Sequence, residues 1–207
     1  MSLPVRKLAD LIPRKPAAAA LCPYTPAGLP QLPEGAITEI YGARSSGRTT
    51  LLHAALAAAT NAGELCALID AADAFDPCSA SHASVHLNRL LWVRSHHDAH
   101  DALKSADLVL HAGGFKLIAL DLCGADTQRI PVSWWHRLRL AVENTTSILL
   151  VTTDTPLLRQ AASLQIALES HRALWSGTLF EGADIAVRQR KPMQIAPAPT
   201  ILQARTK

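Results

Sequence analysis

Residues 42–50 read GARSSGRTT, a run of the form G-x-x-x-x-G-K-[ST] in which Arg48 takes the lysine position. Runs of this form wrap their backbone amides around a phosphate group. The residues expected to hold the phosphates of a nucleotide are Gly42, Ser45, Ser46, Gly47, Arg48, Thr49 and Thr50. Arginine keeps the positive charge of lysine but is a wider, planar fork with a different reach. The run therefore favours phosphate binding more than catalysis.

A carboxylate that could help to hold a metal ion ends the apolar run at 117–121, which reads LIALD. Beside a phosphate loop, an aspartate at a strand end helps to hold Mg²⁺, and the loop hydroxyl binds the ion directly. Asp121 and Thr49 are therefore the candidate magnesium ligands, and ATP with Mg²⁺ is the candidate cofactor. The alternative is a glycine-punctuated turn kept for packing after nucleotide binding was lost.

The elements that must position these residues alternate regularly along the chain. Strand-like runs lie at 36–41, 65–70, 90–94, 116–121 and 147–153, and the stretches between them are long enough for helices, as at 50–61 and 132–143. This alternation predicts an α/β fold with a mostly parallel sheet flanked by helices. Because ligands bind where such strands end, Gly42, Asp70, Asp121 and Asp154 are expected along one rim.

The two ends of the chain depart from this rhythm. Strand-like runs at 164–174 and 183–189 predict an antiparallel ribbon at the C-terminal edge of the sheet. Residues 1–34, rich in proline and alanine, predict an N-terminal arm that is either a frayed terminus or a docking segment. Residues 35–190 form the predicted core domain, and 191–207 the predicted flexible tail.

Composition excludes several classes of protein. The chain has 207 residues, which is enough for one substantial domain. Its net charge of +3 is too small to indicate nucleic-acid binding by itself. No run approaches the roughly 18 apolar residues of a membrane span, and the N-terminus lacks a secretory pattern. The four cysteines fit no zinc spacing and are expected to be reduced. The sequence predicts a cytoplasmic protein that does not bind a membrane.

Three other groups of residues have both a simple and a functional interpretation. Trp135 is expected to pack with the helix, whereas Trp134 is either a packing residue, a partner anchor or a platform for base stacking. His96 and His100 lie one helical turn apart, where capping and exposure explain them more simply than a metal ion does. Basic residues near the C-terminus either contact phosphate or an acidic partner, or belong to a solvated tail: Arg188, Arg190, Lys191, Arg205 and Lys207.

Residues 35–50, GAITEIYGARSSGRTT, and residues 66–77, CALIDAADAFDP, closely resemble the core of the bacterial RecA recombinase family. The resemblance runs from about residue 29 to 174 and is densest over 35–94, where the loop, the second strand and the Asp-Pro turn match in order. It implies a RecA-like P-loop core. It also implies that Asp76, at the position of the family's base contact, belongs to the nucleotide site.

The same resemblance implies that much of the catalytic machinery is missing. Ala72 takes the place of the family's catalytic glutamate, and Asp154 that of its γ-phosphate-sensing glutamine, where a negative charge would repel phosphate. Ser79 takes the place of the aromatic residue that stacks on adenine. The segments at the family's two DNA-binding loops are short, and no counterpart of its C-terminal domain is expected. A strand-exchange filament is therefore not predicted.

This combination is similar to the ImuA-type accessory proteins of the bacterial mutasome. It implies a role in SOS-induced translesion DNA synthesis with little or no ATP hydrolysis. The implied partners are a Y-family-like polymerase subunit and an error-prone replicative polymerase, with RecA and single-stranded DNA as further candidates.

Two alternative functions remain open on the sequence. One is a DNA-dependent ATPase of DNA repair, in which Arg48 replaces lysine and Asp73 supplies the missing base. The other is a SulA-like regulator of cell division. The second is less favoured, because SulA-like chains usually lack a recognisable phosphate loop.

Overall fold

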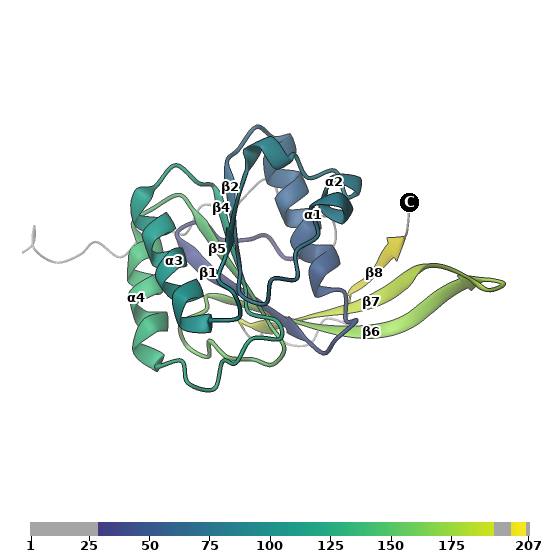
Figure 1. Cartoon of the computed structure of the whole chain (residues 1–207). Coiled ribbons are helices and arrows are strands. Elements are labelled where there is room, and N and C mark those ends of the chain that lie inside the picture. Colours follow the sequence, from purple (N-terminus) through teal and green to yellow (C-terminus); the bar gives the residue numbers. More distant parts are fainter. Residues whose placement is uncertain (1–28, 193–199, 206–207) are drawn as a thin grey trace, which may run out of the picture.

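The alternating apolar runs form the strands of one sheet in a computed structural model, which describes residues 29–192 and 200–205 (Figure 1). The sheet has eight strands in the order β3-β2-β4-β5-β1-β6-β7-β8. The strands are β1 Ala36–Gly42, β2 Cys66–Asp70, β3 Leu90–Arg94, β4 Leu117–Asp121, β5 Ile148–Thr153, β6 Leu164–Ser176, β7 Leu179–Lys191 and β8 Thr200–Arg205. The helices are α1 Arg48–Asn61, α2 Pro77–His82, α3 Ala99–Ala112 and α4 Val132–Glu143, with a 3₁₀ turn at Leu87–Arg89.

The first five strands pair in parallel, β6 continues the parallel sheet beside β1, and β7 and β8 add to it antiparallel. This confirms the predicted α/β fold with an antiparallel C-terminal edge. Helices α1 and α2 cover one face of the sheet, and α3 and α4 cover the other (Figure 1). Two apolar clusters follow from the alternation of side chains along each strand, so that Ile40 packs beneath α1 and Ile37 packs beneath α3 and α4.

Helices α3 and α4 behave as the sequence pattern indicates. Trp135, Leu138 and Val142 form the buried stripe of α4. Trp134 is half-buried, with its ring edge-on to His100 at 5.2 Å between centroids. Asp98 caps α3 by accepting hydrogen bonds from the backbone N–H groups of His100 and Asp101, which agrees with the capping interpretation of this segment.

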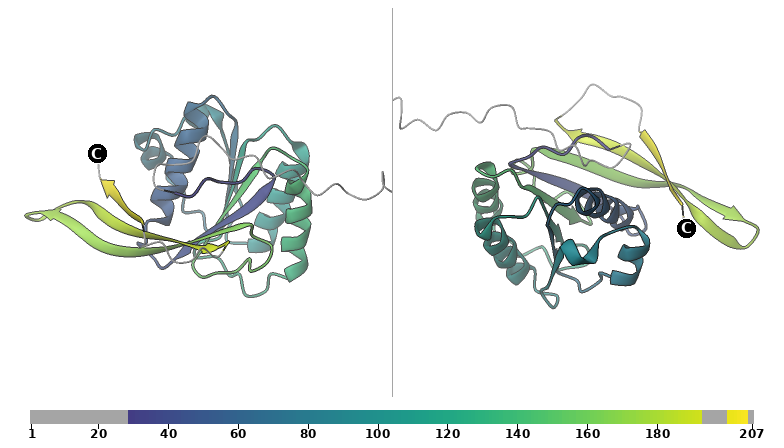
Figure 2. Two further views of the ribbon diagram at one scale, coloured as in Figure 1. Left: turned by 180° about the vertical axis from the view of Figure 1, so that it is seen from behind. Right: turned by 90° about the horizontal axis from the view of Figure 1, so that it is seen from above.

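The β6–β7 ribbon extends well beyond the body of the molecule (Figure 2). Its outer edge is covered by β8, which lies within the segment predicted as a flexible tail. Leu202 and Ala204 of β8 pack against the cluster beneath α1, and this burial stabilises the short strand at the edge of the sheet. At the other end of the chain, Leu32 of the predicted arm is 2% exposed and also belongs to that cluster. The rest of the predicted arm, residues 1–28, lies outside the described residues.

No helix in the described part of the chain is long and apolar enough to cross a membrane.

A buried carboxylate, that of Glu39 on β1, fixes the turn that leads from β5 to β6. It is fully buried and accepts hydrogen bonds from Leu157 N–H at 2.6 Å and Leu158 N–H at 3.1 Å. It also accepts from the Thr153 hydroxyl at 3.2 Å and from the side-chain amide of Gln165 at 2.6 Å. The carboxylate thus satisfies backbone groups that no strand partner reaches, and it ties the end of β5 to β1 and β6.

We expect Glu39→Ala to lower the free energy of unfolding by about 3 kcal/mol or more, because it leaves several buried donors without an acceptor. Urea unfolding followed by circular dichroism measures this change. Glu169→Ala, on the exposed part of β6, is the control and should cost no more than about 0.5 kcal/mol. Equal effects of the two substitutions would contradict the role given to Glu39.

Candidate nucleotide site

The phosphate loop lies between the end of β1 and the start of α1, as the strand, loop and helix context predicts. The Ser46 N–H donates to the Ala43 carbonyl at 3.1 Å and closes the loop. Gly47 has a φ of 92°, and a Cβ atom there would lie 2.1 Å from Cδ1 of Ile185 on β7. Glycine is favoured at this position, because the backbone angle strains other residues and a Cβ atom would displace the Ile185 side chain.

Within the described residues, no side chain caps the first turn of α1, which presents its backbone N–H groups. This turn contains no acidic residue. The side chains of Ser45, Thr49 and Thr50 are exposed around it. Because free N–H groups and the helix dipole attract anions, the loop retains the geometry for a phosphate group.

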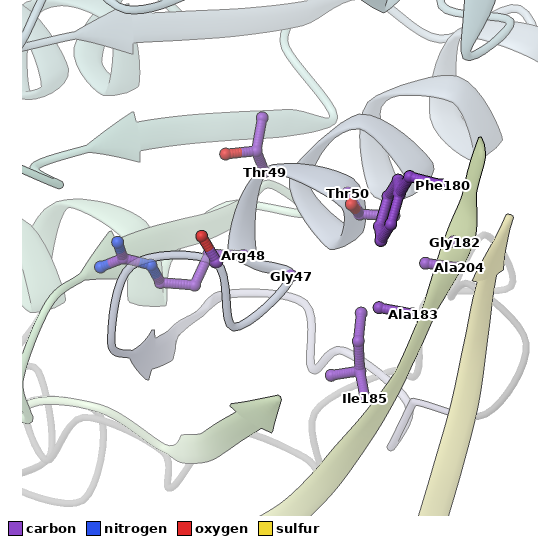
Figure 3. A pocket seen from close by; sticks show the side chains of 10 residues that line it. Gly47, Arg48, Thr49, Thr50, Phe180, Gly182, Ala183, Ile185 and Ala204 are labelled. Atoms are coloured by element: carbon purple, nitrogen blue, oxygen red, sulfur yellow. The ribbon is translucent and has the colours of Figure 1, made fainter. Parts of the chain in front are cut away.

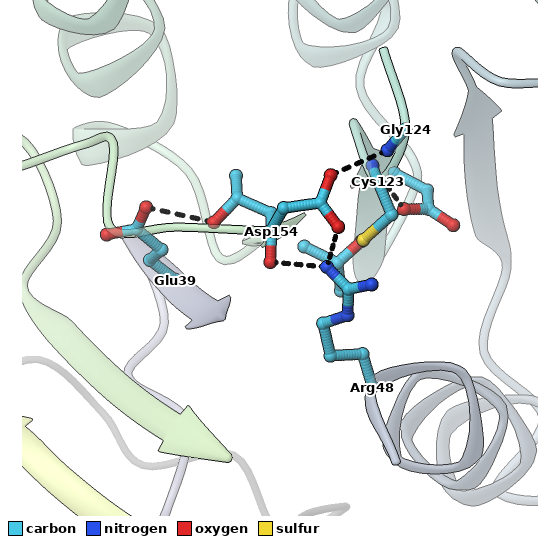
Figure 4. Close-up of polar contacts among 8 residues, drawn as sticks. Glu39, Arg48, Cys123, Gly124 and Asp154 are labelled. Atoms are coloured by element: carbon cyan, nitrogen blue, oxygen red, sulfur yellow. Dashed lines mark hydrogen bonds and ion pairs between the residues drawn. The ribbon is translucent and has the colours of Figure 1, made fainter. Parts of the chain in front are cut away.

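The guanidinium of Arg48 is bonded within the protein (Figure 4). Its Nη1 donates to Oδ1 of Asp154 at 2.6 Å and to the carbonyl oxygen of Thr153 at 2.8 Å. The other carboxylate oxygen of Asp154 accepts the N–H of Gly124 at 2.8 Å. The two residues that the sequence marks as departures, at the lysine and glutamine positions, therefore form one ion pair between α1 and the end of β5.

This ion pair is partly screened by solvent. The side chain of Arg48 is 9% exposed, whereas that of Asp154 is 44% exposed. Partial burial alone would raise the pKa of Asp154, but the Gly124 N–H and the Arg48 guanidinium outweigh it and hold the pKa below its ordinary value. Asp154 is thus a stable counter-charge for Arg48, so the pair adds little net positive charge to the phosphate loop.

The candidate magnesium ligands come from two elements, β4 and α1. Asp121 ends β4, as predicted, and its Oδ1 accepts the Thr152 hydroxyl at 2.7 Å and the Cys123 N–H at 3.0 Å. Thr49 is exposed on the first turn of α1. Both are hard oxygen donors, which suit Mg²⁺, and this ion commonly binds through one or two protein oxygens together with water and phosphate. The donor set therefore fits a magnesium ion that arrives with a nucleotide.

A thiol neighbours this carboxylate. Burial raises the pKa of Cys123, and the charge of Asp121 raises it further. Cys123 is therefore a neutral thiol at physiological pH and not a reactive thiolate.

The remaining predicted site residues are engaged elsewhere. Asp76 caps α2 by accepting from Ser79 N–H at 2.9 Å and Cys78 N–H at 3.2 Å, and it also accepts the Ser79 hydroxyl. Asp73, the base required by an ATPase, receives two hydrogen bonds from Arg94. This hydrogen bonding by Arg94 is the main cause that lowers the pKa of Asp73. The lower pKa makes Asp73 a weaker proton acceptor.

A cavity of about 330 Å³ lies beside the phosphate loop and is closed on its other side by the ribbon (Figure 3). Gly47, Thr49 and Thr50 line it from the loop and α1, while Phe180 and Ile185 line it from β7. The β7 residues are not among those that the sequence pattern predicts for the site. Nothing in the spacing of the apolar residues of this ribbon indicates that it packs across the loop.

The comparisons with known proteins agree with this architecture. A family model described as the RecA N-terminal domain matches residues 17–133. Protein RecA of Acinetobacter baylyi is 39% identical over 105 residues, which are 51% of this chain and 30% of that protein. Protein RecA of Deinococcus radiodurans is 38% identical over 105 residues, which are 51% of this chain and 29% of that protein. The matched part thus spans about 30% of the length of these relatives.

We expect the Arg48–Asp154 pair to give stability a pH dependence. Because the folded state lowers the pKa of Asp154, its contribution is complete above the ordinary aspartate value of about 3.9 and is lost as the pH falls through the lower folded value. Asp154→Asn should therefore cost about 1 kcal/mol near pH 7, a modest figure because the pair is screened, and almost nothing in strong acid. Urea unfolding over a pH series measures the difference.

The double variant is the control for this measurement. In an Arg48→Gln background, the Gly124 N–H and the charge of Arg44 still lower the pKa of Asp154. The cost of Asp154→Asn should therefore vary less with pH than it does in the unmodified chain. A cost of Asp154→Asn that is constant with pH, or the same in both backgrounds, contradicts the ion pair as its source.

Proposed function

Because the chain belongs to the RecA N-terminal domain family, we propose that it is an ImuA-like accessory protein of SOS-induced translesion DNA synthesis. In this role it binds polymerase partners and hydrolyses little or no ATP. Its proposed partners are a Y-family-like polymerase subunit and an error-prone replicative polymerase. RecA and single-stranded DNA are further candidates.

The observation that carries this proposal is the ion pair between Arg48 and Asp154. A cation directly after the second glycine of a phosphate loop accelerates phosphoryl transfer, because it stabilises the charge that develops on the transferred group. Here the guanidinium instead neutralises a carboxylate at 2.6 Å. Withdrawing it for catalysis would leave Asp154 unpaired beside the phosphates. The site is therefore better suited to holding a nucleotide than to cleaving one.

The surroundings of the site also support an accessory role. Ala72 cannot orient an attacking water, and the neighbouring Asp73 is held by Arg94. A DNA-dependent ATPase would need to break that pair to obtain a base. These features favour the accessory role over the enzymatic alternative.

An exposed apolar surface lies at the tip of the β6–β7 ribbon. Trp175 is 60% exposed and Leu179 is 68% exposed, and the segment at 173–180 contains no charged residue. Large apolar side chains at a projecting tip are unusual on a free surface and are typical anchors for a partner's pocket. The tip therefore supports the binding of a polymerase subunit.

We expect the full chain to pull down the Y-family-like polymerase subunit of the same bacterium. Trp175→Ala should weaken the complex about tenfold or more, because buried tryptophans dominate interface energies. Leu108→Ala, which removes a 70% exposed leucine from α3 on the body of the molecule, is the control and should leave binding unchanged. Absence of a complex, with or without nucleotide and single-stranded DNA, would contradict the proposed function.

A further inference from the structure

The cavity beside the phosphate loop has a polar side and an apolar side (Figure 3). Ser45, Thr49 and Thr50 provide hydroxyl groups from the loop and α1, while the strands opposite provide mainly apolar atoms. Its volume of about 330 Å³ lies within the range of small-molecule sites. The cavity thus adjoins a phosphate-binding loop and offers space for the uncharged part of a ligand.

The side of the cavity formed by β7 and β8 is lined mainly by small residues. Ala183 on β7 and Ala204 on β8 are register partners, so their methyl groups lie on the same face of the ribbon. Ile185, two residues further along β7, lies on that face as well. Because these residues, with Gly182, leave the wall shallow, a planar ring can approach it.

A β-bulge turns Phe180 toward this wall. Trp175 pairs with Phe180, whereas the preceding residue of β6 pairs with Gly182, so that Glu181 is an extra residue in β7. In a regular strand, Phe180 and Ala183 would point to opposite faces, since they are three residues apart. The extra residue brings them to the same face, as bulges near functional sites often do. Phe180 consequently lines the cavity together with Thr50.

We propose that this cavity takes the base of a nucleotide, that Phe180 stacks on the base, and that the phosphates lie on the loop at 42–50. The inference rests on the nucleotide binding included in the proposed function. Asp76 and Ser79, which the sequence places at a base position, are engaged in capping α2. The β6–β7 ribbon therefore supplies the aromatic surface from another element.

This arrangement also determines where the binding energy comes from. The Arg48 guanidinium is bonded to Asp154, so the phosphates receive backbone N–H groups, and the loop arginine left to meet them is the exposed Arg44. Stacking against an aromatic ring tolerates any base, because each base has a π-face. The base then contributes a large share of the affinity. Removal of the Phe180 ring should therefore weaken the binding of every nucleotide and leave the binding of phosphate compounds without a base unchanged.

Calorimetric titration of the full chain tests this assignment, with Mg-ADP and inorganic tripolyphosphate as the two probes. Phe180→Ala should weaken Mg-ADP binding about tenfold or more, as expected for loss of one stacking contact, and leave tripolyphosphate binding unchanged. Phe180→Tyr keeps the ring and should restore Mg-ADP binding to within about threefold of the unmodified chain. Leu179→Ala removes the adjacent exposed side chain, which does not line the cavity, and is the matched control.

Three results would overturn the assignment. If the unmodified chain binds Mg-ADP and Phe180→Ala does not weaken it, the base lies elsewhere, although nucleotide binding stands. If the unmodified chain binds no Mg-ADP at millimolar concentration, the base site fails, whereas the polymerase pull-down still decides the proposed function. If Phe180→Ala instead abolishes polymerase binding without changing Mg-ADP binding, the cavity receives a side chain of the partner.

Discussion

A guanidinium buried among strand ends needs a counter-charge, and this requirement organises the whole nucleotide site. Arg48 is the first residue of α1, and Asp154 follows the last residue of β5. Their ion pair, with the Gly124 N–H bonded to the second carboxylate oxygen, joins three segments that meet at the carboxyl edge of the sheet. Removing either partner would leave an uncompensated charge at this edge, so the two residues depend on each other.

The same pair changes the electrostatics of the phosphate loop and leaves its backbone geometry intact. The loop keeps its glycines, its closing hydrogen bond and the uncapped N-terminus of α1, all of which concern backbone geometry. What changes is the electrostatic part, because the only loop cation that is buried is matched by a carboxylate. With Arg48 paired, the backbone N–H dipoles take a larger part in attracting a phosphate, which favours holding a ligand over transforming it.

The C-terminal ribbon connects this loop with the outside of the molecule. At its root, Ile185 packs on Gly47, and this contact is one reason why the loop position must be glycine. Toward its tip, the Phe180 ring meets the exposed Trp175 ring at 5.2 Å between centroids. One hairpin therefore bears both a wall of the cavity and the apolar tip for which we propose a polymerase partner.

Local patterns in the sequence predict much of this architecture. The alternation of apolar runs predicts the parallel sheet, and the glycines at 42 and 47 predict the loop between β1 and α1. The pairing of Arg48 with Asp154 could not be predicted in this way, because the two residues are 106 positions apart and each looks like the loss of a ligand. The bulge at Glu181 depends on strand register, which the spacing of apolar residues does not reveal. The tail strand β8 is short, and it becomes ordered through burial against the core.

We propose that Asp154 withholds Arg48 from the outer phosphates of a bound nucleotide. Calorimetric titration of Mg-ATP and Mg-ADP against the unmodified chain and Asp154→Asn tests it most directly. The account predicts that the unmodified chain binds both nucleotides with affinities within about threefold, whereas Asp154→Asn prefers Mg-ATP by about tenfold, the gain expected from one charged hydrogen bond to the γ-phosphate. A tenfold preference for Mg-ATP in the unmodified chain, unchanged in Asp154→Asn, would contradict it.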